Sequence, residues 1–102
     1  MAEFDCYRVY FYTAPQYRWD VRIDLDQGGT PKATLLFMKA SEALPANTSQ
    51  NGVILLHYPM AHYPRVMDLL RNERPLYVTL NAANGIGAIS SDAEPVGEQE
   101  GI

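Results

Sequence analysis

Apolar residues recur at every second position along most of this chain, and no other feature constrains its fold as strongly. The alternation is clearest over residues 19–26, where charged side chains separate the apolar ones. The apolar members of that segment are Trp19, Val21, Ile23 and Leu25. Because successive side chains of a strand point to opposite faces, the segment predicts a strand with one face in the core and the other in water.

The same period predicts further strands over residues 7–13, 32–39, 53–58, 76–83 and 86–91. In residues 7–13, one face would carry Tyr7, Val9 and Phe11, and the other Arg8, Tyr10 and Tyr12. Residues 32–39 are apolar on both faces, which predicts a central strand or one that is covered on both sides.

One helix is predicted, over about residues 64–73. Pro64 suits the first helical position, and the residue before a proline favours extended backbone, so the start is marked from both sides. An apolar stripe follows at helical spacing, formed by Val66, Leu69 and Leu70. A helix this short is not stable alone in water. We therefore expect the stripe to pack on the sheet, and Pro75 to follow the end of the helix.

Asn84 and Gly85 separate the last two predicted strands and predict a two-residue hairpin turn, in which both residues have positive φ. Counting outward from this turn pairs Ala83 with Ile86 and Leu80 with Ile89. The inner face of the hairpin would then carry Leu76, Val78 and Leu80.

The resulting order, β-β-β-β-α-β-β, predicts an α+β fold with one strongly curved, mostly antiparallel sheet or a small barrel, and one helix on a face or at an end. All eight basic residues and eight of the twelve acids lie in residues 1–91, which we expect to form a single, electrically neutral domain. Residues 92–102 carry the whole net charge of −4 and predict an acidic, flexible C-terminal tail.

The chain begins MAEFDCYR, with acidic residues where a signal peptide is basic and then apolar. No stretch approaches the roughly 18 apolar residues that cross a bilayer. Cys6 is the single cysteine, so an internal disulfide is impossible. These features predict a cytoplasmic protein without membrane association, and no spacing of residues indicates a metal or a cofactor.

Both histidines lie in the segment HYPMAHYP, residues 57–64. Histidine changes charge near neutral pH, so His57, His62 and Tyr63 are candidates for a ligand-binding or proton-transfer site. A metal would need a third ligand, and the nearest carboxylate, Asp68, is expected to face away on the helix. The alternative is a rigid elbow, in which the prolines shape the chain and the histidines and tyrosines bond to the backbone.

Asp20, Asp24 and Asp26 share one face of a predicted strand with Arg22 among them. Paired carboxylates carry out glycoside hydrolysis, but that chemistry needs one acid in a desolvated place. A row of alternating charges is typical of a solvated strand face instead. No serine lies in a strand-to-helix elbow, and Cys6 is close to the N-terminus, so we predict no catalytic residue.

Tyrosine is in excess, with seven copies, and several tyrosines alternate with arginines. The predicted interface residues are Arg8, Tyr10, Tyr12, Tyr17, Arg22 and Arg74. Aromatic and arginine side chains are favoured in protein interfaces, and they also hold single-stranded nucleic acid. The order of three strands, a helix and two strands resembles the oligonucleotide-binding barrel coarsely, with an extra strand before the helix. A neutral body attracts no phosphate backbone, so nucleic acid is the less favoured partner.

Arg74 lies just beyond the predicted helix, where Glu73 breaks a local preference because the helix dipole disfavours an anion there. This helix end is either a surface ion pair or a contact site.

Three functions remain open from the sequence. The first is a small interaction or assembly module, homodimeric through a tyrosine-rich sheet face or edge, or bound to another protein. The second is a small-ligand binder or enzyme that uses His57, His62 and Tyr63. The third is single-stranded nucleic-acid binding through Arg8, Tyr10, Tyr12 and Arg22, and the first is the prediction that we favour.

Overall fold

The computed structural model describes residues 1–93, 95 and 96, and in them the chain forms two sheets and one α-helix. The large sheet has the strand order β2-β3-β4-β6-β5 and the small sheet the order β1-β7-β8. The elements are β1 Ala2–Phe4, β2 Cys6–Phe11, β3 Trp19–Gln27, β4 Thr30–Met38, β5 Thr48–Gln50, β6 Val53–Pro59, the 3-10 helix η1 Met60–His62, α1 Tyr63–Asn72, β7 Leu76–Asn81 and β8 Ile86–Ser91.

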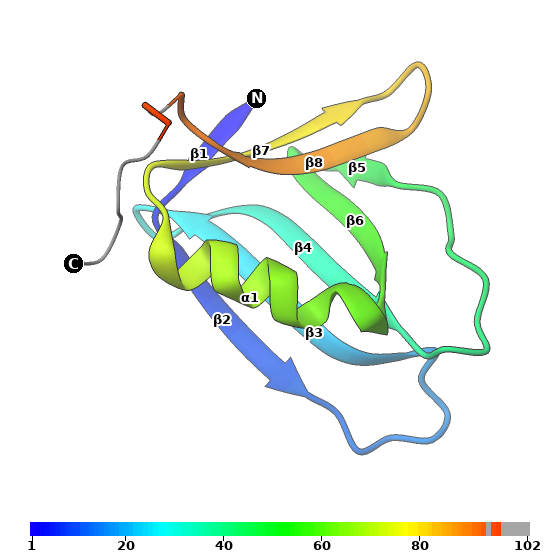
Figure 1. The fold of residues 1–102 in the computed structure, drawn as a ribbon. Helices are drawn as coiled ribbons and strands as arrows, with labels where there is room; N and C mark the ends of the chain where they lie inside the picture. The colour runs from blue at the N-terminus through cyan, green and yellow to red at the C-terminus, as the bar shows by residue number, and fades with distance from the viewer. Residues whose placement is uncertain (94, 97–102) are drawn as a thin grey trace.

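The molecule has two layers, with the large sheet in one and α1 and the small sheet side by side in the other (Figure 1). We call the covered side of the large sheet its inner face and the opposite side its outer face. The core fills the space between the layers, with Phe37, Ile23 and Leu35 of the large sheet fully buried against Val66 and Val78 of the second layer. The predicted α+β class is confirmed.

The sheets are mostly antiparallel, as predicted, with one exception. Strands β4 and β6 pair in parallel, because the chain crosses over through residues 39–52 before β6 begins. The central position predicted for residues 32–39 is confirmed, since β4 lies between β3 and β6. Neither sheet closes in the part of the chain that the structure describes, so the small barrel is not confirmed.

The pattern of alternating apolar residues did not predict two short strands, β1 and β5. β1 pairs with β7, and β5 lies between the strands predicted over residues 32–39 and 53–58. The strand predicted over residues 7–13 is β2, which starts at Cys6 and ends at Phe11. Three residues are too few for a period of two to stand out, and β1 and β5 form because longer strands offer them backbone partners.

The predicted two-residue turn between β7 and β8 is wrong. Leu80 pairs with Gly87 rather than with Ile89, and residues 82–85 form a four-residue loop. The amides of Asn84 and Gly85 both donate to the carbonyl oxygen of Asn81, and the Asn81 side chain accepts from the Ala83 amide. These local bonds stabilise the longer loop. Because the register moves by two residues, the predicted inner face is unchanged, with Leu76 and Val78 buried.

The helix covers residues 63–72, one residue earlier at each end than predicted. Its buried residues are Val66, Met67 and Leu70, whereas Leu69 is only partly buried. The predicted stripe therefore packs on the core at all three positions, with Leu69 at its margin. Met67 was missed because the buried face of the helix is wider than the predicted stripe.

No helix among the described residues is long and apolar enough to cross a membrane. Of the predicted acidic tail, Asp92, Ala93, Pro95 and Val96 are described and exposed, and the remaining residues lie outside the described part of the chain.

Candidate functional site

The outer face of the large sheet collects most of the predicted interface residues. Register places Tyr10 of β2 opposite Arg22 of β3, and Arg8 opposite Asp24, on this face. The intervening residues Tyr7, Val9 and Phe11 oppose the core residues of β3 and point to the inner side. The alternation predicted for these residues therefore places Arg8 and Tyr10 of β2 on one face, beside Arg22 of β3.

Four aromatic rings, which we call the aromatic row, contact one another in sequence along the outer face. The row consists of Tyr10, Tyr12, Tyr17 and Trp19. The ring centroids of successive members are 6.2, 5.2 and 5.0 Å apart, in stacked, edge-to-face and stacked arrangements. Such geometries are favourable between aromatic rings. The row runs from the edge strand β2 through the loop that precedes β3 and ends at the start of β3.

Trp19 was predicted to share the inner face with Val21, and this prediction is wrong. The register of β3 against β4 shifts between these two residues, so that Val21 pairs with Phe37 and Trp19 with Met38. A bulge inserts one extra residue and turns the next side chain to the other face. Because of this bulge Trp19 joins the aromatic row instead of the core.

Two arginines flank Tyr10. The Arg22 guanidinium lies 5.7 Å from the centre of the Tyr10 ring, and Arg8 Nη1 donates to the Tyr10 hydroxyl at 3.4 Å. Arg22 also makes two hydrogen bonds to the Asp24 carboxylate, at 2.8 and 3.2 Å, and hydrogen bonding to Asp24 raises the pKa of Arg22. The guanidinium is therefore fixed between a carboxylate and a ring face, an arrangement that suits arginine.

Two loops are tied together at the end of the aromatic row. Arg18 Nε donates to Glu42 Oε1 at 2.8 Å and its Nη2 to the Ala43 carbonyl oxygen at 3.3 Å. Lys39 donates to the carbonyl oxygens of Ala14 and Tyr17 and lies 3.5 Å from an oxygen of Asp20. The loop before β3 and the loop after β4 are thus held as one unit.

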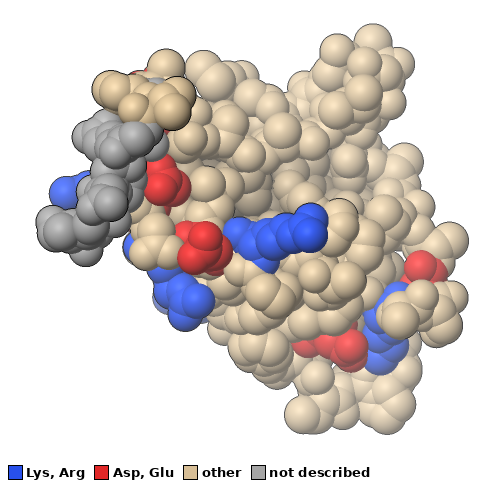
Figure 2. All heavy atoms as spheres, viewed as in Figure 1, with Lys and Arg blue, Asp and Glu red and all other residues tan. Residues whose placement is uncertain are grey.

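Basic groups in this region stand next to acids. Arg18, Arg22 and Lys39 each bind a carboxylate. Basic and acidic side chains also lie close together on the side of the molecule that carries α1, and the upper part of that side, over the β7–β8 hairpin, is uncharged (Figure 2). A surface with neutralised cations provides little attraction for a phosphate backbone.

His57 lies on the outer face of β6, opposite Leu36 of β4. Its backbone amide donates to Asn47 Oδ1 at 2.8 Å, and Asn47 Nδ2 donates to the Gly85 carbonyl oxygen at 3.0 Å. Burial lowers the pKa of His57, and the positive charge of Arg18 lowers it further. His57 is therefore neutral at physiological pH, and Asn47 links β6 to the tip of the hairpin.

The three predicted ligand-binding residues are not brought together. Tyr63 lies on the inner side, where its ring contacts Phe11 and Phe37, each at 5.4 Å between centroids. His62 is exposed, with its ring 6.4 Å from that of Tyr58. Since His57 faces the opposite side of the sheet, no shared pocket joins these side chains. Within the described residues, no group of three or more His, Cys, Asp or Glu side chains is placed to hold a metal.

Arg74 is separated from the other predicted interface residues. It borders a groove of about 870 Å³ between the end of α1 and the chain that leads from β1 to β2, and Arg71, Glu3 and Tyr7 also line this groove. The groove mixes both signs of charge. Of strand β2, only Tyr7 lines the groove.

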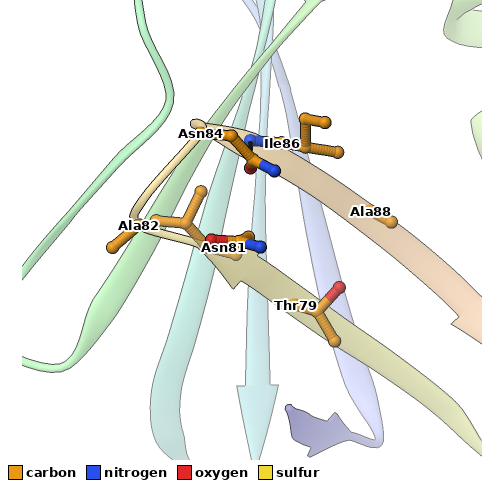
Figure 3. Close-up of a pocket in the computed structure, with 7 residues that line it drawn as sticks. Thr79, Asn81, Ala82, Asn84, Ile86 and Ala88 are labelled. Atoms are coloured by element: carbon orange, nitrogen blue, oxygen red, sulfur yellow. Dashed lines mark hydrogen bonds between the residues drawn. The ribbon is translucent and has the colours of Figure 1, made fainter.

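A second hollow, of about 590 Å³, lies on the β7–β8 hairpin beside Thr79, Asn81 and Ala88 (Figure 3). Its two asparagines already bond to the turn, because the amides of Ala83 and Ile86 donate to the side-chain oxygens of Asn81 and Asn84. The hollow is shallow and the asparagine oxygens serve the hairpin, so they form no evident binding site.

Comparison of the chain with protein families, with curated proteins and with solved structures found no match.

Sequence reasoning missed two residues of this region. Asn47 was not identified as a candidate, although it bonds to both β6 and the hairpin. Phe11 was assigned to a core face, yet its side chain is 65% exposed at the end of β2. The available signal was that Phe11 ends a strand with large side chains on both faces, which is a feature expected of an edge strand.

Proposed function

We propose that this protein is an interaction module that forms a homodimer through β2 and the aromatic row. The observation that carries the proposal is that the row of contacting rings, with Arg8 and Arg22 beside it, begins on a strand at the edge of the large sheet. Tyrosine, tryptophan and arginine are the residues whose burial contributes most to protein interfaces.

The local geometry favours an interface over the rival functions. Side chains at an interface lose conformational freedom on binding, and this cost is small where contacts already hold them. Tyr10 is held by Arg8 and Arg22, and Tyr17 by Tyr12 and Trp19. A nucleic-acid site would need several free cations beside the rings, whereas Arg22 is bonded to Asp24, which leaves Arg8 beside Tyr10. An enzyme site would need His57 and Tyr63 on the same side of the sheet.

Sedimentation of the full chain, from a few micromolar to several hundred micromolar, tests the proposal. The wild-type mass is expected to rise to that of a dimer. Replacing Tyr10 and Tyr12 by serine is expected to raise the dissociation constant at least about tenfold, because each aromatic contact contributes about 0.5–1.5 kcal/mol.

Tyr77→Ser is the matched control, because Tyr77 lies on the small sheet, away from the aromatic row. Its dissociation constant should stay within about twofold of the wild-type value. A wild-type chain that remains monomeric at the highest concentration would contradict the proposal, as would an equal loss for Tyr77→Ser.

A further inference from the structure

We infer that the second copy binds edge to edge, with the two β2 strands antiparallel and Val9 on the two-fold axis. This inference rests on the proposed function and specifies the partner surface and its register. The two five-stranded sheets would then form one continuous sheet across the dimer.

The backbone of β2 presents a free edge at alternate residues. β2 is the outermost strand of the large sheet, with β3 as its neighbour. The Tyr12 amide donates to the Asp20 carbonyl oxygen, which continues the register of β2 on β3. Hydrogen-bonded and non-bonded pairs alternate along an antiparallel ladder. Tyr7, Val9 and Phe11 therefore direct their amides and carbonyls away from β3, toward a partner strand.

The side chains next to this edge are large on both faces. On the inner side Phe11 is 65% and Tyr7 36% exposed, and on the outer side lie the tyrosines of the aromatic row. β2 contains no proline and no lysine, the residues with which natural edge strands avoid pairing. A second strand laid along β2 would cover apolar surface on both faces at once.

The side chains select the register. A two-fold axis normal to the sheet places inner residues opposite inner ones. A shift of one strand by a single residue would place inner residues opposite outer ones, so the axis must pass through a residue of β2. With Val9 on the axis, Arg8 stands opposite the partner's Tyr10, and Tyr7 opposite the partner's Phe11. The first pair repeats a contact that the chain already uses, since Arg22 opposes Tyr10 across β2 and β3.

The neighbouring registers are less favourable. Placing Arg8 on the axis sets two like charges directly opposite each other, which is destabilising. Placing Tyr10 on the axis leaves Cys6 and Tyr7 beyond the end of the paired segment. The register centred on Val9 pairs residues 7–11 of the two β2 strands, sets Cys6 opposite the partner's Tyr12 just beyond the strand, and opposes no like charges.

Val9→Pro tests the edge, because the Val9 amide points away from β3 and its loss leaves the β2–β3 ladder intact. The dissociation constant of the dimer is expected to rise about tenfold or more, with the circular dichroism spectrum unchanged, since the two-fold axis removes two hydrogen bonds at once. Val9→Ala is the matched control: it shortens the side chain but keeps the amide, and should lose less affinity.

Cysteine pairs test the register in a Cys6→Ser background. A mixture of Arg8→Cys and Tyr10→Cys chains is expected to form a disulfide-linked dimer on mild oxidation, because directly opposed residues in a non-bonded pair lie about 4.5–5.5 Å apart. Arg8→Cys alone would link efficiently only if Arg8 lay on the axis, and Tyr10→Cys alone only if Tyr10 did.

The outcomes separate the inference from the proposed function. A dimer that survives Val9→Pro, or a wild-type dimer for which the mixed pair does not link, would overturn edge pairing in this register and leave the aromatic row as the interface. If Val9→Pro fails to fold, the cysteine pairs alone decide. A wild-type chain that stays monomeric overturns both.

Discussion

β2 and β8 are both six-residue strands at the edge of a sheet, and they differ in what their side chains offer to a partner. β2 has the sequence CYRVYF, with large side chains on both faces. β8 has the sequence IGAISS, in which only the two isoleucines are large. Each strand leaves one row of backbone groups unpaired. Both strands have a neighbour on one side only, so we expect the larger side-chain area of β2 to make it the interface and β8 to remain a boundary.

The support beneath the two edges also differs. The inner side of β2 lies next to α1, where the ring of Phe11 contacts that of Tyr63. The inner side of β8 approaches β6 so closely that a Cβ atom added at Gly87 would lie 2.2 Å from Leu56 Cδ2. β8 must therefore be small at Gly87, because the two sheets meet there, whereas Ile89 further along the same face packs against the core.

Leu70→Ala is expected to have the largest effect on stability, because it removes buried contacts from the helix that supports β2. The free energy of unfolding should fall by about 2–5 kcal/mol. Leu69→Ala should cost less, since Leu69 is only partly buried. Urea unfolding of the two variants measures the difference, and a larger loss at Leu69 would mean that the face of α1 is assigned incorrectly.

Gly87→Ala probes the close approach beneath β8. The added methyl group overlaps the buried side chain of Leu56, so the free energy of unfolding should fall by about 1–3 kcal/mol. This loss exceeds the gain of about 0.4–1 kcal/mol from restricting the unfolded chain. Ala88→Val, on the outer side of the same strand, should stay within about 0.5 kcal/mol of wild type. Equal effects at both positions would argue against the sheet contact.

The smallest effect on stability is expected from His57, which lies on the outer face of β6. Its pKa is lower in the folded state than the ordinary histidine value of about 6.5, chiefly because of burial. As pH falls below about 6.5, the unfolded chain binds a proton that the folded chain resists, so the free energy of unfolding should decrease. His57→Gln should reduce this dependence in thermal unfolding between pH 7.5 and pH 5. An unchanged pH profile in that variant would show that His57 is not its source.

The segments that the sequence predicted best are those in which a long pattern agrees with burial. The alternation over residues 19–26 and the two apolar faces of residues 32–39 correspond to β3 and to the central strand β4. The start of the helix at Pro64 was predicted within one residue, because the ring of proline restricts the backbone locally. These features depend on neighbouring residues and can be read along the chain.

The candidate site was predicted in part. The alternation that places Arg8 and Tyr10 on one face agrees with the register of β2. The position of Trp19 was not predictable, since it depends on a one-residue bulge against β4. The role of Asn47 was hidden for a similar reason, because its partners lie 10 and 38 residues away in the chain.

By itself, the sequence determined where the longer strands extend, where the helix begins and, away from the bulge at Trp19, which side chains share a strand face. Only the tertiary structure decided that the strands divide into two sheets, that β2 lies at an edge and that the aromatic row assembles on the outer face. The physical reason is that periodicity and proline act over a few residues, whereas strand order, bulges and edges arise from pairing between distant segments.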